Sequence, residues 1–190
     1  EGELRPVGDP VDAAIVLGAH ERGALPHDGQ HPVRELPFDP VRKRMALVYD
    51  QNGGRRVYVK GAPEVVLERS TMPADEVAST VAVAEEWASR GLKVLAVAER
   101  ALPDAAVDED DLERALSVVG LVALHDPLRQ TAHDAVEEAR AAGLRVEMIT
   151  GDHPLTAQAI GHSLGLPDTA IHARVTPAEK LRLVESLQSE

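Results

Sequence analysis

The chain has 190 residues, 44% of them hydrophobic and 27% charged, a composition typical of a globular protein with one sizeable core or two small ones. Its formal net charge of −12 argues against nucleic acid as the main partner, although a nucleotide needs only a local basic cleft. Zero cysteines exclude disulfides and cysteine-ligated zinc, and no apolar run approaches the ~20 residues that cross a bilayer, so we expect no membrane insertion by this chain.

The acidic, turn-rich opening lacks the pattern of a signal peptide, and the first residue is not Met, so we expect a piece of a longer protein. Asp9 before Pro10 predicts a helix start, with Asp12 in the first turn, where the helix dipole favours an acid. No spacing of histidines and carboxylates matches a closed metal site, so we predict no metal ligands.

Residues 35–69 contain two β-rich runs, ELPFDPVRKRMALVY and RVYVKGAPEVVLER, around an Asn-Gly-Gly turn, and they predict an antiparallel hairpin. Apolar residues then recur at helical spacing over 75–90, Gly91 predicts the end of that helix, and the run LKVLAVA at 92–98 is typical of a buried strand. We predict that the acidic run at 104–113 is a solvated loop that leads to a short helix.

The rest of the chain alternates strands and helices. The strands are predicted at 118–124, 145–150 and 170–173, and the helices at 131–142, from Pro154 to Gly165, and after a capping box at 176–179. In the first of these helices the residues predicted to face inward are Ala135, Val136, Ala139 and Ala142. The apolar residues predicted to share one face are Leu155, Ala159 and Leu166 in the second helix, and Leu181, Val184 and Leu187 in the last. Such alternation implies a parallel sheet. The fold class is therefore α/β: an α+β domain with an antiparallel sheet at 1–117, then an incomplete Rossmann-like parallel domain at 118–190.

The turn Thr150-Gly151-Asp152 is a candidate anion site. A strand ends in Thr150, Gly151 permits a tight turn, and a helix follows with Asp152 as N-cap and Pro154 in its first position. This arrangement presents a hydroxyl and free N–H groups together, and phosphate is the commonest anion bound in this way. On geometry alone an ordinary strand–turn–helix stays open as the alternative.

A series of motifs resembles the cytoplasmic part of P-type cation-transporting ATPases. The motifs are GDPVDAAIVLGA, PFDPVRKRM, KGAPE, LKVLAVA, HDPLR, TGDHPLTA and ARVTPAEKLRLVESLQ, and they follow one another in the order of that family. The resemblance covers nearly the whole chain. It implies a nucleotide-binding domain that takes ATP or ADP, followed by the middle of a haloacid-dehalogenase-like phosphorylation domain.

The resemblance assigns the nucleotide contacts residue by residue. Phe38 corresponds to the aromatic residue that stacks on adenine, with Lys60 at the base of the pocket and Asp12 near the adenine amino group, and an aromatic face beside cations suits a purine. Pro40 replaces a frequent Arg, so that phosphate contact falls to Arg42 or is absent. The implied nucleotide-binding residues are Asp12, Phe38, Arg42, Lys43, Lys60, Gly61, Lys93, Asp126 and Arg129.

The same resemblance implies a phosphate-binding catalytic set. Thr150 corresponds to the Thr of the family's second phosphate-binding motif, Lys180 to the Lys that neutralises the acyl-phosphate, and Arg174 to an Arg near the phosphorylation site. The implied catalytic residues are Thr150, Gly151, Asp152, Arg174 and Lys180.

Two motifs of a working pump are missing: DKTGT, which carries the aspartate nucleophile, and GDGxND, which carries Mg²⁺ ligands. The resemblance implies that both belong to a parent ATP hydrolase, which transports a cation by way of an aspartyl-phosphate with ATP and Mg²⁺. The other partners would be its remaining phosphorylation, actuator and transmembrane parts. We expect this chain to lie at the cytoplasmic face of the membrane and to be inactive alone. The alternatives are a non-catalytic nucleotide-binding or regulatory module and, less favoured, a haloacid-dehalogenase-like phosphatase.

Overall fold

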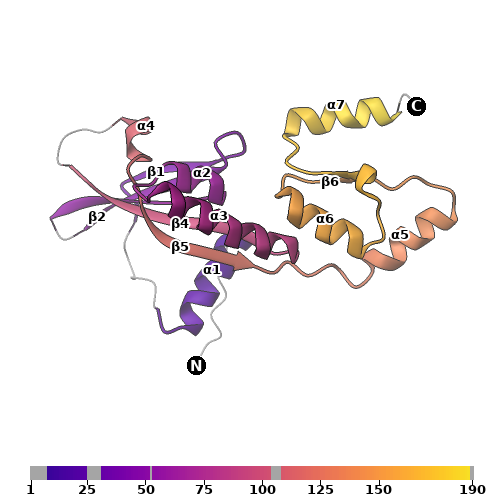
Figure 1. Ribbon diagram of the computed structural model, residues 1–190, viewed down its shortest axis with the longest axis horizontal. Coiled ribbons are helices and arrows are strands. Elements are labelled where there is room, and N and C mark those ends of the chain that lie inside the picture. Colours follow the sequence, from indigo (N-terminus) through magenta and orange to yellow (C-terminus); the bar gives the residue numbers. More distant parts are fainter. Residues whose placement is uncertain (1–7, 25–30, 52, 104–107, 189–190) are drawn as a thin grey trace.

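The computed structural model describes residues 8–24, 31–51, 53–103 and 108–188. Figure 1 shows two lobes side by side along the long axis of the molecule. The first lobe holds α1–α4 and β1–β5, the second holds α5–α7, β6 and β7, and the chain passes between them once, after β5. Both lobes combine helices and strands, which confirms the predicted α/β class.

The first lobe is built on a five-stranded antiparallel sheet in the order β1-β2-β3-β4-β5. The strands are β1 (Arg34–Asp39), β2 (Arg44–Gln51), β3 (Gly54–Gly61), β4 (Lys93–Leu102) and β5 (Ser117–Leu124). β2 and β3 form the predicted hairpin, in which Gln51 pairs with Gly54 and Gly53 supplies the left-handed turn conformation with φ +82°. The first β-rich run is not one strand, because a turn at residues 40–43 divides it into β1 and β2.

The strand predicted at 118–124 is present as β5, but the prediction that it opens the parallel sheet is wrong. β5 pairs antiparallel with β4, from Lys93 opposite Leu124 to Glu99 opposite Ser117. Without β5, β4 would present a bare row of backbone donors and acceptors, and pairing satisfies them. The division of the chain into domains at residue 117 stays a prediction, although a cut there would separate β5 from its sheet.

Helices cover both faces of the five-stranded sheet. They are α1 (Pro10–Glu21), α2 (Pro63–Glu68), α3 (Ala74–Ser89) and α4 (Glu109–Leu112). The main core lies on the face under α2, where Val57 and Val59 of β3 and Val66 of α2 are at most 1% exposed. Side chains alternate across a strand, so Lys60 points to the opposite face. There it pairs with Asp12 of α1, which places α1 on that face.

The predicted helix signals in the first lobe are confirmed. The Asp9 carboxylate accepts hydrogen bonds from the backbone N–H groups of Val11 and Asp12 and caps α1. α3 ends at Ser89, and Gly91 follows with φ +80°.

The acidic run is less solvated than we predicted. Glu113, its last residue, is 1% exposed, because it lies between the guanidinium groups of Arg42 and Arg44. A buried carboxylate normally needs such partners. Residues 104–107 of the same run lie outside the described residues.

The second lobe contains a two-stranded parallel sheet flanked by helices. Its elements are α5 (Ala132–Ala141), β6 (Met148–Ile149), α6 (Pro154–Ser163), a 3-10 turn (Asp168–Ala170), β7 (Ile171–His172) and α7 (Pro177–Gln188). The parallel pairing of β6 with β7 was predicted, but β6 is much shorter than the predicted strand at 145–150. The capping box of α7 is confirmed: the Thr176 N–H donates to the Glu179 carboxylate, and the Glu179 N–H donates back to the Thr176 hydroxyl.

The helices of the second lobe bury less apolar surface than predicted. α5 has no buried residue, and Ala135 and Ala142 are exposed rather than inward-facing. Leu181 of α7 is likewise 62% exposed. α6 packs more closely: a Cβ at Gly161 would lie 2.4 Å from Ile171 Cδ1, so the glycine lets α6 approach β7.

Candidate functional site in the cleft between the lobes

A cleft of about 790 Å³ lies between the two lobes. Its walls come from the β1–β2 turn, α2, α3 and the start of β4 in the first lobe, and from the β6–α6 turn and the segment after β7 in the second. The acidic and basic residues in its walls are Lys43, Glu64, Glu85, Lys93, Asp152 and Arg174. Formal positive and negative charges therefore balance across the cleft.

The turn between β1 and β2 brings Phe38 and Lys43 to one wall of the cleft. The Asp39 carboxylate fixes the turn by accepting from the N–H groups of Val41 at 2.8 Å and Arg42 at 2.7 Å. These bonds lower the pKa of Asp39: the backbone N–H of Arg42 has the largest effect, and the small burial of the group opposes it. Phe38 is 61% exposed, so its ring face is available to a planar ligand.

Lys93 and Asp152 join the two lobes across the cleft. The Lys93 ammonium donates to Asp152 Oδ1 at 2.9 Å, and the Thr150 hydroxyl donates to Asp152 Oδ2 at 2.9 Å. Burial raises the pKa of Asp152, but the hydrogen bond and charge of Lys93 and the Thr150 hydroxyl outweigh it, so the net pKa lies below its ordinary value. Asp152 is therefore an ionised partner of Lys93 at neutral pH.

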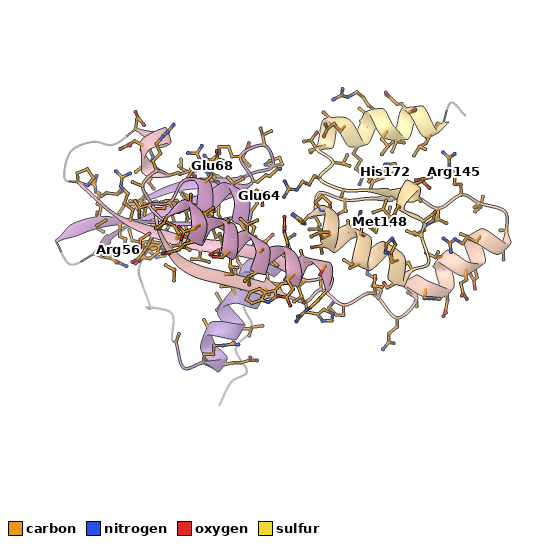
Figure 2. All side chains as sticks on the ribbon, viewed as in Figure 1. Arg56, Glu64, Glu68, Arg145, Met148 and His172 are labelled. Carbon is orange, nitrogen blue, oxygen red and sulfur yellow. The ribbon has the colours of Figure 1, made fainter. Side chains whose placement is uncertain are left out.

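A second ion pair of opposite polarity crosses the same cleft. Glu64 of α2 pairs with Arg174, which follows β7. Glu64 Oε1 is buried and makes no hydrogen bond within the described part of the chain, so its contact with Arg174 is electrostatic. Figure 2 shows Glu64 on the side of the first lobe that faces the second. Arg174 has φ +54°, a conformation that non-glycine residues rarely adopt and that gathers at functional sites.

His153 lines the cleft at the start of α6. Burial lowers the pKa of His153, and the positive charge of Arg174 lowers it further, against a smaller opposite effect of Glu64. Its Nδ1 accepts a hydrogen bond from the Leu155 N–H at 3.3 Å, as a neutral imidazole can. His153 is thus the N-cap of α6, and the prediction of Asp152 as cap is wrong, because the Asp152 carboxylate is bound to Lys93 and Thr150.

The comparison with known families assigns the first lobe. A family model described as P-type ATPase, cytoplasmic domain N, matches residues 1–131. The chain belongs to the P-type ATPase family. This match covers all of β1–β5, including the wall of the cleft that carries Phe38 and Lys43.

Individual P-type ATPases are similar along most of the chain. A sodium/potassium exporting P-type ATPase of Schizosaccharomyces pombe is 43% identical over 145 residues, which is 70% of this chain and 14% of the relative. A cation-transporting ATPase of Synechocystis is 33% identical over 97% of this chain and 24% of its own length. A calcium-transporting ATPase of Listeria monocytogenes is 29% identical over 99% of this chain and 26% of its own length.

The chain therefore spans about a quarter or less of the length of these P-type ATPases. Their names share cation transport and differ in the ion. In the part of the chain that the structure describes, no helix has the length and apolar character to cross a membrane.

The structure places the predicted adenine residues in two locations. Asp12 and Lys60 contact each other on the α1 face of the sheet, but neither is in the wall of the cleft that includes Phe38. Burial lowers the pKa of Lys60, and the charge of Asp9 partly restores it. The proximity of Asp12 and Lys60 agrees with their shared assignment, whereas their contact with a nucleotide stays a prediction.

Gly61 and Arg42 both have structural partners in the first lobe. A Cβ at Gly61 would lie 2.5 Å from Arg44 Cβ and 2.6 Å from the Lys43 carbonyl oxygen, so the close approach of β2 requires glycine here. The Arg42 guanidinium donates to both carboxylate oxygens of Glu113 at 3.0 Å and to the Pro37 carbonyl at 2.9 Å. These contacts account for both residues without a ligand.

Four further predicted residues, besides Asp12, Lys60, Gly61 and Arg42, are not among the residues that line the cleft. Asp126 and Arg129 are exposed in the segment between β5 and α5, and Lys180 is exposed in the first turn of α7. Thr150 directly precedes Gly151, which lines the cleft, and the Thr150 hydroxyl donates to the Asp152 carboxylate. Gly151 is in the wall, and a Cβ there would meet only the Val175 carbonyl at 3.9 Å, so no close contact requires glycine at this position.

Sequence reasoning missed two residues that line the cleft. Glu64 is the last residue of the KGAPE motif, and nothing in the neighbouring sequence indicated that it would form an ion pair with Arg174. His153 was visible as the residue before Pro154, a position where a cap is expected. Outside the cleft, sequence reasoning also missed the burial of Glu113, which stood in an acidic run. Only Arg42 of the β1–β2 turn and Arg44 of β2, 71 and 69 residues earlier, explain its burial.

Proposed function

We propose that this chain binds ATP or ADP as the nucleotide-binding part of a cation-transporting P-type ATPase. The observation that carries the proposal is the composition of the cleft. An exposed aromatic ring lines it, together with three cations that come from both lobes. The ring is Phe38, and the cations are Lys43, Lys93 and Arg174. Membership of the P-type ATPase family supports the same reading.

Phe38 would hold the adenine by stacking. Its open face can receive a purine without displacing a packed neighbour, since the side chain is 61% exposed. Lys43, on the same turn, would offset the charge of the phosphates nearest the base.

Lys93 and Arg174 would hold the phosphate chain from opposite lobes. Arg174 can offer two parallel N–H groups to phosphate oxygens, and Lys93 offers a single point charge. A polyphosphate that contacts both would hold the lobes together, in place of the ion pairs that Glu64 and Asp152 now make with these cations.

In the whole pump, we propose that an aspartate outside the printed sequence accepts the γ-phosphoryl group, with Thr150 and Lys180 offsetting charge on the transferred group. The chain would lie at the cytoplasmic face of the membrane. Without a DKTGT motif, the chain alone should hold ATP without forming an acyl-phosphate. Incubation with γ-labelled ATP and Mg²⁺ followed by acid precipitation tests this, and stoichiometric label on any aspartate would contradict it.

Mg²⁺ is an implied cofactor of the whole pump. In the described part of the chain, no three His, Cys, Asp or Glu side chains lie close enough to hold a metal ion. That most of the Mg²⁺ ligands lie outside this chain stays a prediction.

The test of nucleotide binding is calorimetric titration with ADP and ATP. Base–aromatic stacking is worth about 1–3 kcal/mol, so Phe38→Ala should weaken binding by about one to two decades. Val41→Ala is the matched control, because Val41 is on the same turn, is 78% exposed and is not in the cleft wall. Equal affinities of wild type, Phe38→Ala and Val41→Ala would refute the adenine assignment, and no binding by wild type would refute the proposed function.

A further inference from the structure

The carboxylate of Glu113 is buried at the centre of an ion-pair network beneath the β1–β2 turn. Glu113 is the C-cap residue of α4, and it is 1% exposed. It accepts from Arg42 Nη1 at 3.0 Å with each oxygen, and Oε2 also accepts from Arg44 Nε at 2.8 Å. Arg44 is itself 4% exposed, so most of this charge lies inside the lobe.

The network is tied to the backbone on both sides of the turn. Arg42 Nη2 donates to the carbonyl of Pro37, the residue before Phe38, at 2.9 Å. Arg44 Nη1 donates to the carbonyl of Arg42, the residue before Lys43, at 3.1 Å. Phe38 and Lys43, which line the cleft together with Pro40, are therefore each preceded by a peptide group that the network binds.

The turn needs such support, because its own conformation is unusual. Lys43 has φ +54°, which costs about 1–3 kcal/mol and persists only where the surroundings hold it. Phe38 is mostly exposed and receives little packing that could fix its position.

We propose that Glu113 is a positioning residue for nucleotide binding. It does not line the cleft, and it acts through Arg42 and Arg44 by holding the turn so that Phe38 and Lys43 lie at the cleft wall. The effect of Glu113 on nucleotide affinity rests on the proposed function, whereas the positioning of the turn can be measured without any nucleotide.

A purely stabilising role accounts less well for these contacts. A buried ion pair is often no more stabilising than apolar residues of the same volume, because desolvation of the charges opposes their attraction. Charged donors of the network bind two backbone carbonyls, that of Pro37 in β1 and that of Arg42 in the turn. These bonds fix the backbone conformation between the two strands. Glu113 therefore acts on the geometry of the turn as well as on the stability of the lobe.

The chain offers a direct probe of this geometry, since Phe38 is its one phenylalanine and Trp87 its one tryptophan. Labelling with 4-fluorophenylalanine places a single ¹⁹F resonance at Phe38, while Trp87 fluorescence reports whether the lobe is folded. In Glu113→Gln, with Trp87 fluorescence unchanged, we expect a shifted or broadened ¹⁹F resonance in the free protein. We also expect ADP affinity about tenfold lower than in wild type.

Arg56→Gln is the matched control, because it breaks another arginine–carboxylate contact of the same sheet, the 2.7 Å bond to Glu99. Figure 2 shows Arg56 on the side of the first lobe away from the second. This variant should leave the ¹⁹F resonance and ADP affinity unchanged.

Folded Glu113→Gln with the wild-type ¹⁹F resonance and wild-type ADP affinity would overturn the proposal. If Glu113→Gln does not fold, Arg42→Lys decides, since it keeps a cation beside Glu113 but cannot also reach Pro37. A wild-type resonance in free Arg42→Lys then overturns the proposal, and a shifted one supports it. If wild type binds no ADP, the proposed function fails, while the resonance of the free variants still decides whether Glu113 positions the turn.

Discussion

Gly61→Ala should destabilise the first lobe, because β2 and β3 approach too closely there for a side chain. The new Cβ would lie 2.5 Å from Arg44 Cβ, 2.6 Å from the Lys43 carbonyl oxygen and 2.8 Å from Arg44 Cα. Two of these atoms belong to the backbone, so a rotamer change cannot relieve the contact. The Ala62 N–H also donates to the Lys43 carbonyl at 2.9 Å, which holds the strands together at this point.

The cost of such overpacking is about 1–3 kcal/mol. For a protein of this size, each kcal/mol lowers Tm by about 2–4 °C, so a cost of about 2 kcal/mol corresponds to about 4–8 °C. Because the displaced atoms belong to Lys43 and Arg44, the variant should also weaken ADP binding.

Thermal and urea unfolding followed by Trp87 fluorescence would measure this effect. Gly54→Ala is the matched control, since Gly54 begins the same strand and a Cβ there would meet nothing within 4 Å. That variant should keep or slightly raise Tm, because alanine loses less backbone entropy than glycine on folding. Equal Tm values for Gly61→Ala and Gly54→Ala would refute the close-approach argument.

Three further predictions concern the cleft and the second lobe. Glu64→Gln should raise ATP affinity about two- to five-fold in calorimetry, because Arg174 would no longer have to give up its ion pair with Glu64 to bind a phosphate. Partly exposed ion pairs of this kind contribute about 0.2–1 kcal/mol. Weaker ATP binding by the variant would contradict this. The lowered pKa of Asp152 means that its ion pair with Lys93 stabilises the fold above the unfolded pKa of about 3.9 and loses that contribution as pH falls through the lower folded pKa. The stability difference between wild type and Asp152→Asn in urea titrations should therefore begin to shrink as the pH falls below about 4 and disappear below the folded pKa, and a difference independent of pH would count against the pairing. In hydrogen exchange on a proven monomer, amides of β6 should exchange faster than those of β3, because β6 has a single partner strand; equal protection would be inconsistent with this reasoning.

Local chemistry explains what the sequence predicted correctly. The caps at Asp9 and Thr176, the glycine after α3 and the Asn-Gly-Gly hairpin turn each depend on neighbours within a few residues. The assignment of Phe38 and Lys43 to nucleotide binding, and of Thr150-Gly151-Asp152 to phosphate binding, rested instead on the resemblance of separate motifs to one family. Of the residues so assigned, the following line one cleft, while their contact with a ligand stays a prediction: Phe38, Lys43, Lys93, Gly151, Asp152 and Arg174.

Only the tertiary structure decided which distant segments meet. An apolar run such as 118–124 predicts a strand but does not indicate which strand it pairs with. This run became the fifth strand of an antiparallel sheet because it pairs with the otherwise free edge of β4. Likewise, a carboxylate in an acidic run has no local reason to be buried. Glu113 is buried because the fold brings Arg42 and Arg44 around it, and Glu64 acquires a role because the second lobe presents Arg174 to it. Desolvation of a charge depends on which partners the fold supplies, and the sequence determined the charges without determining their partners.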